Sequence, residues 1–249
     1  MRFDTKSSVK IVMLGAGGTG AHIAPHLYRL LYASGRKTRV VIADGDVVEE
    51  KNLVRQNFSF ADVGVNKARA IATRYASAFK MKAEFIPDFI ETPGRLRELV
   101  TPEKNPYHGG TPETVILIGA VDNNSSRKLC DEIFRTSKDL IYIDSGNGEF
   151  SGQVACGIRR NGKTLSKPIG SLYPDILSDD DKFPSELSCA EASVSAPQSI
   201  SANVTAAAVV VDILYNIVVC GECRALRAVF STRTVNVKAE TRKTRRKAA

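Results

Sequence analysis

The feature that most constrains the fold is a glycine motif between an apolar run and a helical pattern. Residues 9–14, VKIVML, are a short apolar run typical of a buried parallel strand. GAGGTG follows directly and matches G-x-G-x-x-G, and a helical pattern continues to about Ser34. In this motif the first glycine permits a tight turn, the second lets the backbone approach phosphate, and the third allows close packing of helix on strand. We therefore expect nucleotide phosphates to bind at this turn, whose glycines are Gly15, Gly17, Gly18 and Gly20.

Strand-like and helical segments alternate through the first 150 residues. This alternation is typical of an open, mostly parallel sheet. Beyond about residue 150 the pattern changes, because segments 149–160 and 227–239 read as antiparallel strands. Between these two strands, the sequence has a Pro/Ser/Asp-rich crossing at 161–188 and then a long apolar core helix at 196–219. The predicted fold class is α/β: a Rossmann-like, mostly parallel sheet flanked by helices, with antiparallel strands added in the C-terminal half. The other expected parallel strands are 39–44, 82–88, 114–122 and 140–148, and the expected helices between them are 64–79, 95–100 and 125–138.

The residues after the second expected strand indicate which nucleotide fits best. Asp44 ends that strand, where an acid can bind ribose hydroxyls. The pyrophosphate of a dinucleotide carries about two negative charges, whereas ATP carries about four and needs fixed cations and usually Mg²⁺. The charge of this loop therefore favours ATP over NAD, and we find no obvious hydride-transfer acid or base for an NAD-linked oxidoreductase. The loop residues that could reach a polyphosphate are Asn52, Arg55, Gln56 and Lys67.

A carboxylate suited to a metal ion follows the fourth expected strand. Asp122 ends that strand, at the carboxyl edge where open α/β sheets bind ligands, and a carboxylate there could hold Mg²⁺. Each polar residue of the site also has a plain structural alternative. Arg55 and Lys67 could be surface cations paired with Glu49, Glu50 or Asp62, and Asp46 could cap turn amides. We expect Phe58 and Phe60 of this loop to lie in the core.

Three motifs of this region together resemble the ubiquitin-activating superfamily, in its bacterial ThiF/MoeB branch: GAGGTG, DGDVVEEKNLVRQ and DVGVNKA. AVDNNSSR, GQV at 152–154 and CAEASVSAP at 189–197 extend the resemblance in the same order, over roughly residues 9 to 220. Among the variants of the family, the overall size and the segment AHIAPHLYRL resemble the ThiF-type proteins of plasmid-borne PRTRC gene clusters.

The resemblance implies that ATP adenylates the C-terminal glycine carboxylate of a ubiquitin-like or sulfur-carrier-type protein and that pyrophosphate is released. It implies that Asp44 binds the ribose, that Asp122 holds Mg²⁺, and that Gln56 supports the loop. The phosphates and the developing pyrophosphate charge would be contacted by Asn52, Arg55 and Lys67. Catalysis would consist mainly of positioning and electrostatic stabilisation. The resemblance also implies a homodimer.

Two cysteine features remain open at this stage. The resemblance gives Cys189 the place of a thiol that takes over the activated carboxyl group in some relatives, whereas in others it is a loop thiol. Cys220 and Cys223 form a CxxC pair, but the structural zinc of the family uses two such pairs, and the crossing segment 159–188 has no cysteine. We therefore expect no zinc.

The predicted domain is a single ThiF-like adenylating unit, residues 1–238, with a nucleotide-binding half (1–150) and a half with the crossover loop and partner binding (151–238). Residues 239–249 would be a basic, disordered tail, since the last twelve residues carry six cations and one anion of a chain with net charge +8. Such a tail is either simply solvated or contacts an acidic partner or nucleic acid. No apolar run of about 18 residues and no apolar N-terminal segment is evident, so we expect no membrane span and a cytoplasmic protein with free thiols.

The start of the chain leaves a second function open. Relatives usually carry a helix before the first strand, with an arginine that reaches the ATP of the partner subunit. Only eight residues precede the strand here, with Arg2 and Lys6 as the available cations. The alternative is therefore a nucleotide-binding adaptor or pseudo-enzyme of the same fold, acting in a plasmid-encoded complex.

Overall fold

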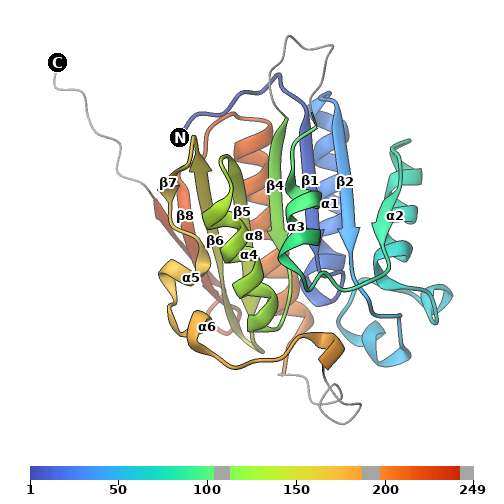
Figure 1. Cartoon of the computed structure of the whole chain (residues 1–249). Coiled ribbons are helices and arrows are strands. Elements are labelled where there is room, and N and C mark those ends of the chain that lie inside the picture. The colour runs from blue at the N-terminus through green and yellow to red at the C-terminus, as the bar shows by residue number, and fades with distance from the viewer. Residues whose placement is uncertain (104–112, 187–196, 242–249) are drawn as a thin grey trace, which may run out of the picture.

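One nine-stranded sheet runs through the computed structural model, which describes residues 1–103, 113–186 and 197–241 (Figure 1). Its order is β3-β2-β1-β4-β5-β6-β8-β9, and β7 pairs with β6 outside this path. Pairing is parallel from β3 to β5 and antiparallel from β5 onward, as predicted. The first five strands are β1 (Val9–Leu14), β2 (Thr38–Ala43), β3 (Glu84–Ile86), β4 (Thr114–Gly119) and β5 (Leu140–Asn147). The others are β6 (Ser151–Arg160), β7 (Lys163–Ser166), β8 (Ala225–Ser231) and β9 (Asn236–Thr241).

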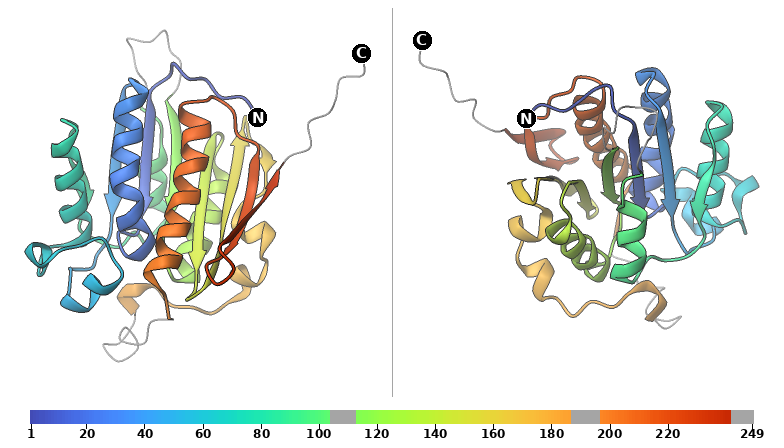
Figure 2. Two further views of the ribbon diagram at one scale, coloured as in Figure 1. Left: turned by 180° about the vertical axis from the view of Figure 1, so that it is seen from behind. Right: turned by 45° about the horizontal axis from the view of Figure 1, so that its top comes forward.

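Helices cover both faces of the sheet (Figure 2). On one face lie α1 (Gly18–Ser34), α2 (Lys67–Ala78) and α8 (Ile200–Val218), with α1 and α8 side by side. The other face carries α3 (Pro93–Val100) and α4 (Asn124–Thr136). Alternate residues of β1 enter the two cores: Ile11 and Met13 face α1 and α8, while Val12 packs with α3 and α4. Because β1 is buried on both faces, its sequence is apolar at every position except Lys10, whose ammonium donates to the Thr101 carbonyl.

The crossing at 161–188 contains structure that the sequence pattern did not reveal. β7 is followed by two single-turn helices, α5 (Ile169–Leu172) and α6 (Asp175–Ser178), and by the 3₁₀ turn η3 (Pro184–Glu186). Pro168 and Pro174 stand at the N-caps of α5 and α6. Elements of four residues or fewer are too short for periodicity to show, so these prolines were the available signal.

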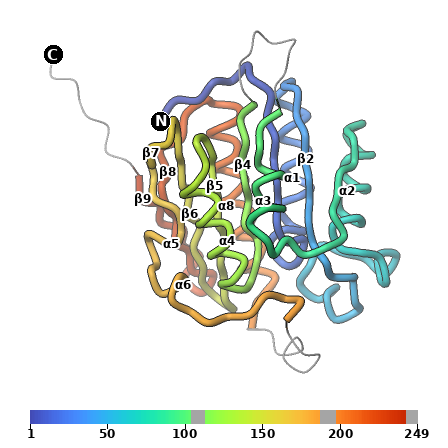
Figure 3. The backbone as a smooth tube through the Cα atoms, in the orientation of Figure 1, coloured from blue at the N-terminus to red at the C-terminus, as the bar shows by residue number. Residues whose placement is uncertain are grey.

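Three expected positions need correction. The fourth strand ends at Gly119, so Asp122 lies in the turn before α4 and not at the end of the strand. The predicted tail begins too early, because β9 pairs with β8 as far as Thr241, at the sheet edge labelled in Figure 3. Phe60 is 77% exposed, whereas Phe58 packs partly against the core. The loop between β2 and α2, which carries both phenylalanines, contains two 3₁₀ turns, η1 (Glu50–Val54) and η2 (Phe60–Asp62).

The helix α8 has the length and mean hydropathy, 1.6, of a membrane span, unlike any other helix in the part of the chain that the structure describes. Half of its most apolar window is buried, and the helix packs on α1, β5 and β6. Among its buried residues, Val210 and Leu214 belong to the core that contains α1 and one face of β1, and Ala206 packs in a smaller cluster with Phe230. The expectation of a long apolar core helix is confirmed.

Candidate nucleotide-binding site

The glycine turn has the backbone shape that the motif predicts. Gly15 has φ +91°, and a Cβ there would lie 2.4 Å from the carbonyl oxygen of Ala120, so only glycine suits this position. The turn therefore brings the end of β1 close to the chain that leaves β4. This is the point in the sheet order where β1 lies between β2 and β4, and where ligands of open α/β sheets bind.

The N-terminus of α1 lacks a side-chain cap. Its N-cap residue is Gly17, and its first turn contains no acidic residue. The first amide groups of a helix have no partner within the helix, and together with the helix dipole they favour an anion. The other long helices are capped by side chains, which belong to Asn66, Thr92, Asn123 and Ser199. The start of α1 is therefore suited to phosphate.

Asp44 lies directly after β2, where the sequence placed a ribose acid. The Ala16 N–H donates to its Oδ2 at 2.6 Å and the Asp46 N–H donates to its Oδ1 at 2.9 Å, so the carboxylate joins the glycine turn to the loop. Burial raises the pKa of Asp44 to about 6, with Lys67 opposing and Asp46 adding to the rise. Each carboxylate oxygen keeps a second lone pair for a ligand hydroxyl.

Lys67 is held at the site by an acid. Its side chain is 8% exposed and its Nζ lies 2.7 Å from Oδ2 of Asp46. The Lys67 N–H also donates to the carbonyl of Asp46. Asp46 is thus the partner that fixes Lys67 beside Asp44. Lys67 pairs with an acid of its own loop, as the structural alternative supposed, but the acid is Asp46 and the lysine is buried rather than on the surface. Its ammonium has three donors, so it can keep Asp46 and still reach a phosphate oxygen.

Asn52 and Gln56 order the loop from within. Oδ1 of Asn52 accepts from the Glu49 N–H at 2.9 Å in a capping box of η1, and its carbonyl accepts from the Gln56 N–H. The buried Gln56 directs its amide toward Gly17, and its Oε1 has no hydrogen-bond partner among the described residues. A buried acceptor without a partner is costly, and a donor from a ligand or water would satisfy it. The hydrogen bonds of Asn52 thus shape the loop, and Gln56 is the residue of this pair with an acceptor that the described residues leave free.

Arg55 lies against the start of α1. Its Nη1 donates to Oε1 of Gln198 at 2.8 Å, and a Cβ built on Gly18 would lie 2.9 Å from the same nitrogen. No carboxylate among the described residues pairs with this guanidinium. Its positive charge is therefore available for an anion at the glycine turn, and pairing with a loop acid is excluded in this conformation.

Asp122 is exposed and makes no hydrogen bond or ion pair within the described residues. Arg127 fixes the turn that carries it, because Nη2 donates to the Val121 carbonyl at 2.7 Å and Nη1 donates to Oδ1 of Asn124 at 3.0 Å. Beneath this turn, Arg127 Nε lies 3.5 Å from Oδ1 of the fully buried Asp144. Burial raises the pKa of Asp144, while Arg127 lowers it. The carboxylate of Asp122 is thus free on a turn that is held from below.

Asp122 suits a magnesium ion that is shared with phosphate. Within the described ranges, no three His, Cys, Asp or Glu side chains come close enough to bind a metal together. Mg²⁺ at phosphate sites commonly uses one or two carboxylates, with phosphate oxygens and water as the other ligands. The residues present therefore fit Mg²⁺ that arrives with a nucleotide, rather than a closed protein cage.

Several residues of the site were not predicted, because they come from distant parts of the chain. They are Thr19, His22, Asn147, Gln198 and Asn203, which contact one another or Arg55. Nothing distinctive in the sequence marked them, since Asn203 is one of several polar residues in its helical segment, with Ser201, Thr205, Asp212 and Asn216. Arg2 and Lys6 precede β1, so they lie at the amino end of this strand, whereas the glycine turn follows its carboxyl end (Figure 1). Arg2 forms a bridge with Glu222 there, and neither cation reaches the glycine turn of its own chain.

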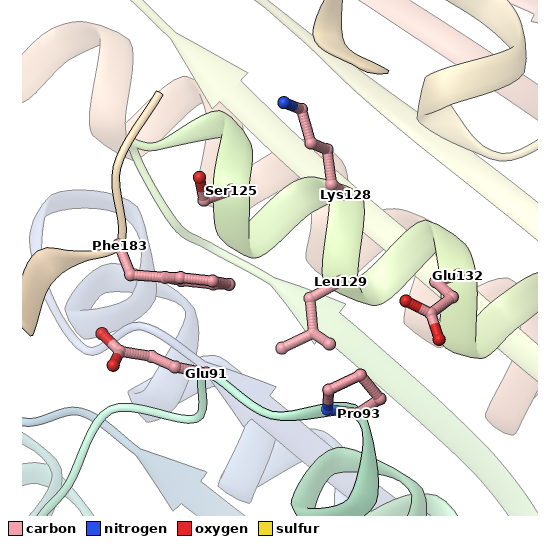
Figure 4. A pocket seen from close by; sticks show the side chains of 7 residues that line it. All are labelled: Glu91, Pro93, Ser125, Lys128, Leu129, Glu132 and Phe183. Atoms are coloured by element: carbon pink, nitrogen blue, oxygen red, sulfur yellow. The ribbon is translucent and has the colours of Figure 1, made fainter. Parts of the chain in front are cut away.

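A cavity of about 280 Å³ lies apart from the predicted residues, between the helices α3 and α4 (Figure 4). None of the predicted site residues lines it. Its Glu91 already accepts from the Ser185 N–H at 3.1 Å. The lining residues are Glu91, Pro93, Ser125, Lys128, Leu129, Glu132 and Phe183.

Cys189 lies outside the described residues. The four described cysteines are free thiols, as expected: Cys130, Cys156, Cys220 and Cys223. Cys220 is exposed, and Cys223 is buried.

Comparison with known proteins decides the family. The ThiF family model matches residues 4–248. The chain belongs to the ThiF family. A crystal structure of PaaA superposes with a TM-score of 0.63 at 21% identity, covering 94% of this chain and 64% of PaaA. Escherichia coli MccB, crystallised with AMPCPP and MccA, gives 0.61 at 18% identity, with 94% and 63% covered.

Another MccB structure, described as a microcin C7 biosynthetic enzyme in complex with N-formylated MccA, gives a TM-score of 0.60 at 17% identity and covers 94% of this chain and 64% of that chain. At these identities the likeness establishes the fold. This ThiF-family chain spans a little under two thirds of the length of these proteins. No curated protein sequence matches it significantly. The predicted membership of the ThiF/MoeB branch and the predicted fold class are confirmed.

Proposed function

We propose that this ThiF-family protein uses ATP and Mg²⁺ to adenylate the C-terminal carboxylate of a small protein or peptide. The observation that carries the proposal is the Arg55 guanidinium, which lies at the uncapped start of α1 with no carboxylate partner among the described residues. A cation at this position can balance the negative charge of a triphosphate, which the helix N-terminus alone would not neutralise. E. coli MccB, which shares the fold, has been crystallised with ATP and with MccA, and this supports the nucleotide and the peptide partner.

In the proposed reaction, an oxygen of the partner's carboxylate attacks the α-phosphorus of ATP. The bond from that phosphorus to the bridging oxygen breaks, and pyrophosphate leaves with the electron pair. Negative charge grows on the leaving group, where Arg55 and Lys67 can stabilise it. Mg²⁺ held by Asp122 would neutralise phosphate charge as a Lewis acid. The attacking carboxylate is already ionised, so no side chain has to remove a proton.

The specific partner in this proposal is a ubiquitin-like or sulfur-carrier-type protein that ends in glycine, acted on in the cytoplasm. This choice rests on the resemblance of the motifs to the ubiquitin-activating superfamily. Whether Cys189 then takes over the acyl group is a separate question, which a thioester trap with Cys189→Ala as control would answer.

A homodimer is part of the proposal and is supported by the outer face of α8. Ile200, Val204 and Tyr215 are 53%, 46% and 50% exposed. At 100° per residue they lie within about 60° of one another around the helix, so they form one apolar stripe. Exposed apolar stripes commonly mark interfaces. Sedimentation should give a dimer for the native chain and a monomer for the double variant Val204→Glu/Tyr215→Glu, and a native monomer would contradict this part.

The adenylation itself is tested by exchange of labelled pyrophosphate into ATP. Exchange should require a partner with a C-terminal glycine, and Arg55→Ala and Asp122→Ala should each lower the rate by about 10²–10³, the usual loss for one charge-stabilising group. Arg69→Ala, on the exposed side of α2, is the matched control for loss of a cation. Normal exchange in either site variant would refute the roles given to these residues.

A nucleotide-binding adaptor without turnover is the second candidate. It would keep the same nucleotide contacts, Arg55 and Lys67, without the chemical step. Tight ATP binding without exchange, with any partner, would select the adaptor. In that case we propose that the basic segment after β9 contacts nucleic acid, which predicts salt-sensitive DNA binding that is lost when residues 242–249 are deleted.

A further inference from the structure

A fully buried asparagine stands in the first turn of the apolar helix α8. Asn203 is 0% exposed, and both ends of its side-chain amide are occupied. Its Oδ1 accepts from Nδ2 of Asn147 at 2.9 Å, and its own Nδ2 donates to the Arg55 carbonyl at 3.4 Å. A buried amide costs free energy unless it is satisfied, so its partners indicate what this residue is for.

The partners of Asn203 form a chain of neutral groups that ends on Arg55. The Thr19 hydroxyl in the first turn of α1 donates to Oδ1 of Asn147 at 2.8 Å, and Asn147 in turn donates to Asn203. The Arg55 carbonyl accepts a second hydrogen bond, from Nε2 of His22 at 3.1 Å. A carbonyl can only accept, so this nitrogen of His22 must carry the proton. Two donors from two helices thus fix one carbonyl.

Gly18 belongs to the same arrangement. A Cβ on Gly18 would lie 2.5 Å from Nδ2 of Asn203 and 2.9 Å from Nη1 of Arg55. Real Cβ atoms do not approach so closely, so a side chain here would displace one or both groups. The glycine motif therefore leaves room for Asn203 and Arg55 at this position, in addition to its effect on the backbone.

We propose that Asn203 is a positioning residue for the triphosphate site. Together with His22 it holds the backbone of Arg55, so that the guanidinium stays over the amide end of α1. The inference rests on the proposed function for the nature of the ligand. A neutral amide suits this task, because a carboxylate in its place would repel phosphate and neutralise Arg55. Asn203 itself need not touch the nucleotide.

The test compares ATP with AMP, because the two nucleotides share adenine and ribose but only ATP has the β- and γ-phosphates. In Asn203→Ala, ATP should bind about 10- to 100-fold more weakly, the scale of one lost buried hydrogen-bond partner, while AMP binding changes by no more than about twofold. Asn216→Ala is the control on the same helix, since the exposed side chain of Asn216 bonds only the carbonyl of Asp212. Equal loss of ATP and AMP, or no loss of either, would overturn the inference.

Two further measurements separate this inference from the adenylation proposal. In an Arg55→Ala background, Asn203→Ala should add little to the loss of ATP affinity, because the group that it positions is gone. A crystal structure of Asn203→Ala should show the Arg55 guanidinium away from Gly18, and an unmoved Arg55 would refute the positioning role even in a protein that lacks turnover. Binding of both nucleotides with no exchange by the native protein would reject adenylation alone.

Discussion

Arg55 lies against Gly18 of the glycine turn, whereas Asp122 comes two residues after Ala120, which packs against Gly15, and different kinds of contact hold them. Arg55 is fixed through neutral groups, the imidazole of His22 and the amide of Asn203. The turn of Asp122 is fixed through a buried ionic pair, Arg127 with Asp144. The neutral contacts are satisfied, whereas Nε of Arg127 and Oδ1 of Asp144 have no hydrogen-bond partner among the described residues.

The difference follows from what each side has to hold. A cation aimed at phosphate is best supported by groups without charge, because a nearby carboxylate would compete for it. The Asp122 turn needs support for an anion, and a guanidinium beneath it lowers the electrostatic cost of that anion. A buried ion pair is a costly way to do so, since removal of one partner leaves an unpaired charge. The two sides should therefore respond differently to mutation and to pH.

The largest difference should appear in stability. Arg127→Leu should lower the free energy of unfolding by about 3–5 kcal/mol, the cost of an unpaired buried charge. Asn203→Ala should lower it by only about 1–3 kcal/mol, the cost of an unsatisfied buried amide. Urea denaturation of the apo protein measures both, and equal losses would erase the distinction between the two sides.

A second change sharpens the same test. Without Arg127, Asp144 should become more stable in its protonated form, so Arg127→Leu should be less destabilised at pH 5 than at pH 8. The double variant Arg127→Leu/Asp144→Asn should recover part of the loss, because the buried charge is gone. A loss that is independent of pH and not rescued would show that Arg127 acts through packing alone.

The next effect concerns Asp44, whose pKa is raised to about 6 by burial. A carboxyl with a raised pKa stabilises the fold most below its unfolded pKa, so this contribution should fall by about 3 kcal/mol as the pH rises from about 4 to above 6. Asp44→Asn should remove that part of the pH dependence of unfolding. AMP binding should run the opposite way and weaken below about pH 6, because the ionised carboxylate is the better acceptor for ribose hydroxyls. AMP affinity that is constant from pH 5 to 8 would contradict the ribose role.

The smallest expected effect is that of Asp46→Asn. Asp46 is about half exposed, so loss of its pair with Lys67 should change the free energy of unfolding by only about 0–1 kcal/mol. Because Asp46 raises the pKa of Asp44, the variant should move the pH midpoint of AMP binding downward. A midpoint that stays in place would mean that Asp46 and Asp44 are not electrostatically linked.

The parts that the sequence could predict are local in the chain. Gly15, Asp44 and Lys67 belong to strand ends and turns whose geometry their immediate neighbours dictate, and the structure places them together. The network around Arg55 could not be predicted, because its bonds join residues 128, 56 and 148 positions apart. Only the folded sheet brings the end of β5 and the start of α8 to the glycine turn.

The limits of pattern reading also show at Asp122. The apolar run suggested a strand through residue 122, but the chain turns after Gly119, where the Ala120 N–H donates to the Leu14 carbonyl and Asn123 caps α4. Strand ends depend on such pairings with other segments, which an apolar pattern does not contain. The predicted chemistry of Asp122 stays a prediction, and its place in the fold is corrected.

A crystal structure of the protein with ATP and Mg²⁺ tests the central claim most directly. The triphosphate should lie at the start of α1, within hydrogen-bond distance of the Arg55 guanidinium and the Lys67 ammonium, with the metal ion bound to Asp122. A nucleotide bound elsewhere, or a triphosphate that leaves Arg55 on Gln198 and Asp122 without metal, would contradict the account.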